Sequence, residues 1–330
     1  MHKQYVDMLI CPECHGKLEW DIKEESEERI INASIHCREC KCKYEVRDEI
    51  AVFLTNSLSR NDLWQKNESG LEKYFKEYPQ VYEKLMNTPE EELGGADYWL
   101  KASCLEMKGD YERSCKMFQN AFEKIYTKDY IDGWKSQMNY ILDSVKKQNK
   151  PVVDIASGKG YLVEKLLKET NNYVVATDFS PNILSRNKEY YTFKGLYDKL
   201  SLIAFDARKT PFKDASIETM TSYLGLQNIE SPGDVIKEMC RITKGKFMPI
   251  MLFINKNDKV HMDLMGNDAY ATRENAVSTF NKYDWNVQIK NSYLADIKPT
   301  PVGIIIEGGR IDGFPLNETK IEFCTIVAEK

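Results

Sequence analysis

The chain has 330 residues, of which 42% are hydrophobic and 29% are charged, and its formal net charge is −5. Such a chain can bury a sizeable core and is long enough for roughly two domains. Its acidic balance argues against a general attraction to nucleic acid or anionic membranes. Apolar runs stay shorter than the roughly 18 residues that span a bilayer, and the first residues lack an apolar export segment. We therefore expect a cytoplasmic protein without a membrane partner.

Five of the nine cysteines lie within residues 1–56. Two C-x-x-C pairs predict two tight turns that direct four thiolates at one structural zinc ion. The predicted ligands are Cys11, Cys14, Cys37 and Cys40. The alternative is that these thiols are buried or free. Cys42, His15 and His36 are spare donors beside the turns, and we expect them outside the coordination sphere. Residues 1–56 are thus predicted to form a zinc ribbon with two strands around an acidic turn.

The stretch KCKYEVRDEIAVFL, which begins directly after Cys40, resembles the zinc ribbons of small methyltransferase-activating proteins. The order of modules resembles ribosomal-RNA guanine methyltransferases that carry a ribbon before the catalytic domain. However, residues 1–56 contain twelve Asp or Glu and eight Lys or Arg, and a four-thiolate zinc site adds further negative charge. A ribbon that binds phosphate should have the opposite balance. We interpret it as a structural or protein-facing module.

Residues 57–146 are rich in Glu, Lys, Leu, Tyr and Met and are predicted to be helical. Within them, residues 96–124 resemble one tetratricopeptide unit, with small and aromatic residues where two antiparallel helices meet. Repeat arrays need about three units to bury a continuous core. We therefore expect a single helical hairpin packed on the next domain. The following helix carries Tyr130 and Trp134.

Residues 147–330 alternate apolar strands with amphipathic helices, which predicts an α/β domain with a doubly wound, mostly parallel sheet. Its first strand runs into a glycine-containing turn, VVDIASGKGYL. A P-loop is excluded because its lysine must be followed by Ser or Thr, whereas Gly160 follows Lys159 here. The dinucleotide fingerprint is weak because Val163 replaces its third small residue.

Three consecutive strands of this domain are predicted to end in Asp154, Asp178 and Asp206. Because the carboxyl ends of parallel strands bind ligands, these acids should lie around one site. S-adenosylmethionine, which has no phosphate, fits them. Asp178 can accept both ribose hydroxyls, Asp206 the adenine amino group, and Asp154 lies near the ligand's ammonium group.

From about Val152 to Thr243 the motifs DIASGKGYL, DFSP and DAR resemble class I S-adenosylmethionine-dependent methyltransferases. The resemblance implies a seven-stranded Rossmann-like sheet. Ala156 replaces the first glycine of the family pattern, a change expected to cost little. Lys159 is expected to be a solvated charge, and the alternative is a contact with the methionine carboxylate of the cofactor. The implied cofactor residues are Asp154, Ala156, Ser157, Gly158, Gly160, Tyr161, Asp178, Phe179, Ser180, Asp206, Ala207, Tyr223 and Leu224.

The loop SYLGLQNI after the fourth strand resembles the loop of quinone-ring and small-molecule methyltransferases that faces the methyl group. The candidate acceptor residues are Tyr130, Trp134, Gln227 and Asn228, although the first two are equally compatible with a core position. The loop lacks the Asn/Asp-Pro-Pro-aromatic signature of amino-group methylation of bases.

We therefore expect methyl transfer by direct displacement to a small-molecule or metabolite-like acceptor, with the protein aligning the reactants. Two alternatives remain open. One is an RNA base methyltransferase that uses the ribbon to dock its substrate, and the other is a cofactor-binding scaffold with a protein partner and no turnover. No general base is assigned. A glycine-containing insertion at 299–319 is expected between or across the last two strands.

Overall fold

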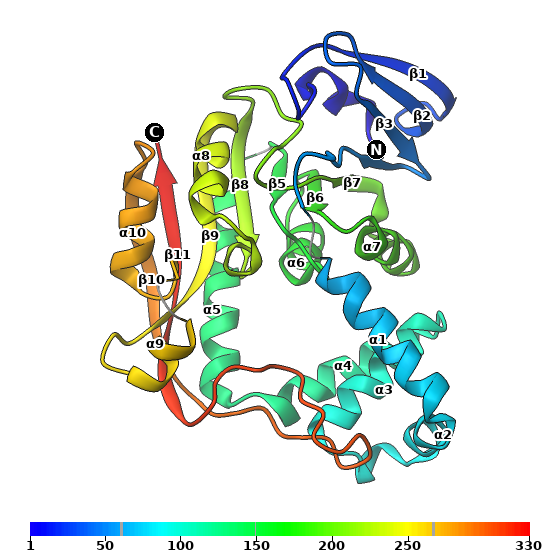
Figure 1. Ribbon diagram of the computed structural model, residues 1–330, viewed down its shortest axis with the longest axis vertical. Coiled ribbons are helices and arrows are strands. Elements are labelled where there is room, and N and C mark those ends of the chain that lie inside the picture. Colours follow the sequence, from blue (N-terminus) through cyan, green and yellow to red (C-terminus); the bar gives the residue numbers. More distant parts are fainter. Residues whose placement is uncertain (60–61, 149, 266–267) are drawn as a thin grey trace.

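A computed structural model describes residues 1–59, 62–148, 150–265 and 268–330 (Figure 1). Residues 60 and 61 of the predicted helical segment lie outside the described residues, as do 149, 266 and 267 of the predicted third domain. Within the described ranges, none of the helices has the length and apolar character needed to cross a membrane.

One continuous sheet organises the described part of the chain, with its strands in the order β1-β2-β3-β4-β7-β6-β5-β8-β9-β11-β10. Neighbours from β7 to β9 are parallel, whereas β11 and β10 are antiparallel. The last seven strands in this order confirm the predicted doubly wound, mostly parallel sheet. They are β5 (Val152–Asp154), β6 (Val174–Asp178), β7 (Leu200–Ala204), β8 (Ile217–Tyr223), β9 (Thr243–Ile254), β10 (Asn286–Ile297) and β11 (Thr319–Glu329).

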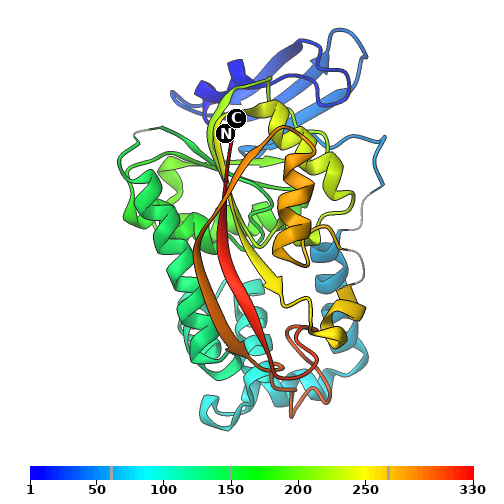
Figure 2. The same cartoon turned by 90° about the vertical axis from the view of Figure 1, so that its left-hand side faces the viewer.

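The central strands are apolar on both sides because helices cover both faces of the sheet. Val153 and Val175 point into one core, whereas Val152 and Val174 point into the other, as the two-residue period of a strand requires. Three helices pack on the second face, namely α5 (Lys128–Val145), α6 (Tyr161–Glu169) and α7 (Pro181–Phe193). The first face is covered by α8 (Pro232–Ile242) and α10 (Arg273–Asn281), and the short α9 (Lys259–Met265) follows β9 (Figure 2).

The N-terminal ribbon extends this sheet instead of standing apart from it. Its strands are β1 (Leu18–Glu25), β2 (Ile30–Cys37), β3 (Lys43–Arg47) and β4 (Ile50–Val52). They pair antiparallel in sequence, and β4 then pairs parallel with β7, with Ile50 opposite Leu202. Apolar side chains of the ribbon also belong to the first core. Backbone pairing and the first core thus both cross residue 56. The domain boundary expected at this residue stays a prediction.

The predicted helical segment begins with α1 (Leu63–Glu77) and α2 (Pro79–Asn87) and continues with a hairpin of α3 (Gly95–Met107) and α4 (Tyr111–Ile125). Gly109 lies between the two hairpin helices with a φ of 78°, a left-handed conformation that favours glycine. The Ser114 hydroxyl donates to the Ala102 carbonyl at 2.9 Å and joins the helices. The 3-10 helices of the described residues are η1 (Lys3–Met8), η2 (Glu90–Glu92), η3 (Tyr197–Lys199) and η4 (Leu226–Asn228).

The predicted insertion lies between β10 and β11, where it occupies residues 298–318, and runs across to the hairpin (Figure 1). The buried carboxylate of Asp97 on α3 accepts hydrogen bonds from three successive backbone N–H groups of the insertion. The donors are Ile304, Ile305 and Ile306, at 2.6, 3.0 and 3.1 Å from the carboxylate. The insertion is therefore anchored to the helical segment.

Candidate functional site

The turn between β5 and α6 has three residues in the left-handed region, with φ values of 51° at Ala156, 52° at Gly158 and 77° at Gly160. A Cβ on Gly160 would lie 2.2 Å from the hydroxyl oxygen of Tyr191, so only glycine fits this position. At Ala156 the side chain imposes a backbone penalty of about 1 kcal/mol. The expectation that this replacement costs little is wrong, because the penalty arises from φ and not from side-chain size.

The Asp178 carboxylate closes this turn at the carboxyl end of β6. It accepts the Gly158 N–H at 3.0 Å through Oδ2 and the Ser180 N–H at 3.0 Å through Oδ1. Burial is the largest effect on its pKa and raises it to about 6, although the two N–H donors act in the opposite direction. The Asp178 side chain is thus held in one orientation, because each of its two carboxylate oxygens accepts a backbone N–H.

A cavity opens at this edge of the sheet. Predicted cofactor residues in its lining are Ala156, Asp178, Phe179, Asp206 and Ala207. Asn228, predicted for the acceptor, lines the same cavity. Sequence reasoning missed Ser59, Thr177, Phe205, Arg208, Ile229 and Glu230. Arg208 directly follows the predicted residues Asp206 and Ala207 in the motif DAR, so the motif could have indicated it. Nothing in the sequence signals that Ser59 approaches the cavity.

Asp206 is oriented by Arg208, two residues later. The guanidinium donates from Nε to Asp206 Oδ1 at 2.9 Å and from Nη2 to Oδ2 at 2.7 Å, a bidentate pair. Arg208 Nη2 also donates to the Ser59 carbonyl at 3.0 Å. The carboxylate predicted to bind adenine is therefore held by a partner that also lines the cavity.

Asp154 does not line this cavity. Its side chain is buried, and its Oδ1 accepts the Thr221 hydroxyl at 2.6 Å. Desolvation by burial raises its pKa to about 6. The carboxylate thus faces β8, and the predicted contact with the cofactor's ammonium group stays a prediction.

Several other predicted residues do not line the cavity and instead stabilise the turn through hydrogen bonds. The Ser157 hydroxyl donates to the Asp154 carbonyl at 3.0 Å, and the Gly158 and Gly160 carbonyls accept side-chain donors from α7. The Ser180 hydroxyl is buried and has no hydrogen-bond partner within the part of the chain that the structure describes. That hydroxyl, beside Asp178, is a polar group suited to a bound ligand.

Lys159 lies between the turn and the helical hairpin. Its ammonium is 3.2 Å from the Glu106 carboxylate and 4.2 Å from the centre of the Phe118 ring, and only 16% of its side chain is exposed. Arg186 on α7 donates to the same carboxylate at 2.7 Å. The expectation of a solvated charge is wrong, because the hairpin, whose position the sequence does not reveal, covers this lysine.

Six rings, here called the aromatic cluster, gather where α4 and α5 meet the carboxyl edge of the sheet. They are Phe122, Tyr126, Tyr130, Trp134, Tyr161 and Tyr223. Phe122 stacks on Trp134 with the ring centres 4.9 Å apart, and Tyr126 stacks on Tyr130 at 4.4 Å. All six side chains remain partly exposed. The indole N–H of Trp134 is buried and has no acceptor among the described residues.

The insertion contributes a carboxylate to the aromatic cluster. The Tyr126 hydroxyl donates to Asp312 at 2.5 Å, and burial raises the pKa of Asp312 above its ordinary value. Of the other predicted residues, Tyr161 and Tyr223 belong to the cluster, and Leu224 lies beside it with a φ of 52°. Gln227 points elsewhere, because its amide donates to the Leu252 carbonyl at 3.0 Å.

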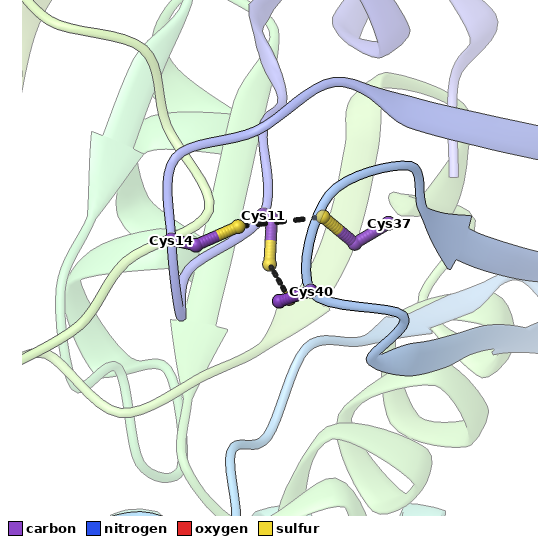
Figure 3. A group of neighbouring side chains, drawn as sticks. All are labelled: Cys11, Cys14, Cys37 and Cys40. Atoms are coloured by element: carbon purple, nitrogen blue, oxygen red, sulfur yellow. Dashed lines mark hydrogen bonds between the residues drawn. The ribbon is translucent and has the colours of Figure 1, made fainter.

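The four predicted zinc ligands come together in the ribbon (Figure 3), with their sulfur atoms all within 4.8 Å of one another. Cys11 and Cys40 sulfurs are 3.5 Å apart, and Cys14 and Cys37 sulfurs 3.4 Å. Zinc–sulfur bonds near 2.3 Å in a tetrahedron separate sulfurs by about 3.8 Å, so the arrangement suits zinc. Across the described ranges, the cluster includes neither Cys42 nor the two nearby histidines.

Residues 153–246 match the family model Methyltransf_11, described as a methyltransferase domain. The chain contains a methyltransferase domain. The match begins in β5 and ends in β9, so it includes the turn, Asp178 and Asp206.

Curated relatives of this methyltransferase domain include the ubiquinone/menaquinone biosynthesis C-methyltransferase UbiE of Rickettsia massiliae. It is 25% identical over 158 residues, which cover 43% of this chain and 62% of the relative. The UbiE protein of Pseudomonas fluorescens is 31% identical over 113 residues, which cover 34% of this chain and 43% of that protein. The chain thus spans less than two thirds of the length of these relatives.

Solved structures similar to this chain include the YcgJ protein of Bacillus subtilis, with a TM-score of 0.47 and 13% identity over 59% of this chain and 98% of that chain. A SAM-dependent methyltransferase from Aquifex aeolicus has a TM-score of 0.40 and 14% identity, covering 58% of this chain and 88% of that chain.

Asp154→Asn should stabilise the cofactor-free protein at alkaline pH. Because the folded pKa of about 6 lies above the ordinary 3.8, ionising Asp154 opposes folding, and its effect develops as the pH rises from about 4 to 6. The stabilisation by the amide should increase by about 2 kcal/mol between about pH 4.5 and about pH 8. Urea unfolding at both pH values measures it, with the exposed Asp143→Asn as control. An equal effect of Asp154→Asn at both pH values would contradict the prediction.

Proposed function

We propose that this protein transfers a methyl group from S-adenosylmethionine to a small-molecule acceptor. The observation that carries this proposal is the placement of Asp178 and Asp206 in the lining of one cavity, beside the left-handed turn after β5. Two fixed carboxylates at neighbouring strand ends suit the hydroxyl and amino groups of an adenosine, and neither would suit a phosphate.

The residues present fit the cofactor. Asp178 would accept the ribose hydroxyls, and Asp206 and the Ala207 backbone would bind the adenine edge. Two residues after Asp178, the buried Ser180 hydroxyl has no hydrogen-bond partner among the described residues. When bound, S-adenosylmethionine supplies a methyl group already activated by its sulfonium. The protein's own task is then to align the acceptor and exclude water from the reacting groups.

The aromatic cluster supports a compact acceptor with an apolar or ring-containing body. Two of its rings are Tyr161, which directly follows the turn after β5, and Tyr223, the last residue of β8. In this proposal the cluster lies on the methionine side of the site. Asp312 and the indole N–H of Trp134 supply one acceptor and one donor within that apolar surface. A few polar groups in an aromatic wall are typical of small-molecule sites.

The UbiE relatives are named for methylation in quinone biosynthesis, which is consistent with this acceptor class. The RNA alternative has the weaker support, because the ribbon has four more acidic than basic residues in 1–56, twelve against eight. A cofactor-binding scaffold without turnover is the third hypothesis, and the same assays distinguish it.

We also propose that the four-cysteine cluster binds one structural zinc ion. Four thiolates fill a tetrahedral shell and leave no position for a substrate or water. The ion would hold the two C-x-x-C turns together at the base of the ribbon, where the Tyr44 hydroxyl lies 3.3 Å from the Cys11 sulfur.

Isothermal titration of the purified protein with S-adenosylmethionine should show binding at one site per chain. Asp178→Ala should weaken it by about 1.5 to 3 kcal/mol, because a buried charged acceptor is lost. Asp143→Ala, on the exposed surface of α5, should bind like the wild type. If the wild-type protein binds no cofactor at about millimolar concentration, the proposed function is wrong.

Incubation with S-adenosylmethionine labelled in its methyl group should place the label in small molecules of a metabolite extract. Trp134→Ala should reduce this transfer while cofactor binding measured by titration stays close to that of the wild type. Total RNA serves as the competing substrate. Label recovered in RNA would favour the second hypothesis, and binding with no transfer to either pool would favour the scaffold.

Elemental analysis of freshly purified protein should find one zinc per chain. Cys14→Ser should lower the zinc content and destabilise the ribbon, because metal binding and folding of so small a module are coupled. Cys42→Ser is the matched control, since Cys42 lies in the ribbon but outside the cluster. Absence of zinc from the wild-type protein, or an equal loss of zinc in Cys14→Ser and Cys42→Ser, would refute the zinc site.

A further inference from the structure

The first cysteine turn of the ribbon is joined to the cofactor cavity by a closed triangle of side chains. Glu13, between Cys11 and Cys14, has one carboxylate oxygen 2.9 Å from the Lys209 ammonium. Its other oxygen accepts the Ser57 hydroxyl at 2.8 Å, and the Lys209 ammonium donates to that hydroxyl oxygen at 2.9 Å. Three residues from distant parts of the chain thus fix one another.

Lys209 is the last residue of the turn that presents the adenine-side residues to the cavity. Its backbone N–H donates to the Asp206 carbonyl at 2.9 Å, which closes a four-residue turn. The first three residues of that turn, Asp206, Ala207 and Arg208, line the cavity. A side chain that holds Lys209 therefore holds one wall of the cavity.

Ser57 provides a second connection between the ribbon and the cavity. Two residues later, Ser59 lines the cavity, and its carbonyl accepts from Arg208 at 3.0 Å. The segment that leaves the ribbon and the turn 206–209 are thus bonded to each other twice, once through Lys209 and once through Arg208.

Backbone pairing adds a third connection just before the cysteine turn. The Ile10 N–H donates to the Pro211 carbonyl at 2.7 Å, and the Lys213 N–H donates to the Met8 carbonyl at 2.9 Å. The chain therefore enters the cysteine turn directly from its pairing with the segment that follows the cavity wall. A change in the conformation of the cysteine turn would be transmitted to both sides of that wall.

We propose that the metal-loaded turn Cys11–Cys14 positions the cavity wall 206–209 and so sets the affinity for the cofactor, with Glu13 and Lys209 as the positioning residues. This inference rests on the proposed function. The two side chains are 27% and 32% exposed, so breaking their ion pair should weaken cofactor binding only roughly threefold. Removing the metal releases the whole turn and should weaken it by about tenfold or more.

Coupling between two sites is reciprocal. If zinc at the cysteine turn strengthens cofactor binding, the cofactor must strengthen zinc binding by the same factor. The zinc affinity, measured by equilibrium competition with a chelating dye, should therefore rise when S-adenosylmethionine is present. This readout does not depend on catalysis.

The second cysteine turn offers a matched control. Arg38, between Cys37 and Cys40, pairs with Glu19 at 2.7 Å within the ribbon. Glu19→Gln thus removes an ion pair of one cysteine turn by the same chemical change as Glu13→Gln, and neither Glu19 nor Arg38 lines the cavity.

The experiment uses the full zinc-loaded chain and titrates S-adenosylmethionine into wild type, Glu13→Gln, Lys209→Met, the double variant and Glu19→Gln, with zinc content measured for each. Glu13→Gln and Lys209→Met should each bind roughly threefold more weakly, the double variant no more weakly than about the worse single variant, and Glu19→Gln like wild type. S-adenosylmethionine should raise the zinc affinity of the wild type and raise it less in Glu13→Gln.

Wild-type affinity for the cofactor in both zinc-containing single variants would overturn the coupling while leaving the proposed function intact. A zinc affinity of the wild type that does not change when the cofactor is present would do the same. Weakening by Glu19→Gln equal to that by Glu13→Gln would also overturn it, because the effect would then be general to the ribbon. A wild type that binds no S-adenosylmethionine would instead overturn the proposed function.

Discussion

The left-handed turn between β5 and α6 is the constraint on which the candidate site depends. Gly160 has no room for a side chain against Tyr191, and the Gly158 N–H is bonded to Asp178 on the neighbouring strand. The turn therefore brings the ends of β5 and β6 together at the edge of the sheet. A second close approach, between Gly225 and Ala156, sets the loop after β8 against the same turn, since a Cβ on Gly225 would lie 2.7 Å from the Ala156 Cβ.

Three parts of the chain that are far apart in sequence converge on this edge. The ribbon reaches it through Glu13 and Lys209, and the hairpin reaches it through Glu106 and Lys159. The insertion between the last two strands arrives from the other side and is tied to the hairpin through Asp97. Among the described residues, the methyltransferase domain supplies all of the cavity lining except Ser59, and the added segments hold that lining from outside.

Much of this arrangement could be predicted from the sequence, because strand ends and cysteine spacings carry local signals. Asp178 and Asp206 follow apolar runs, so their meeting at one sheet edge follows from the topology. The remainder depends on tertiary contacts that leave no local signal. The burial of Lys159 requires the hairpin to lie over it, and the approach of Ser59 requires the ribbon to join the sheet. Asp154 faces β8 because Thr221 is its partner, a pairing that spacing alone does not reveal.

The parallel pairing of β4 with β7 has a consequence for the order of folding. Strands β1 to β4 meet their antiparallel partners within a few tens of residues, but β4 waits for a strand on the order of 150 residues further along the chain. During synthesis the ribbon therefore leaves the ribosome with an unpaired strand edge at β4, which stays unpaired until β7 has been made. The ribbon thus precedes its partner strand in the chain and can join the sheet only once β7 is present.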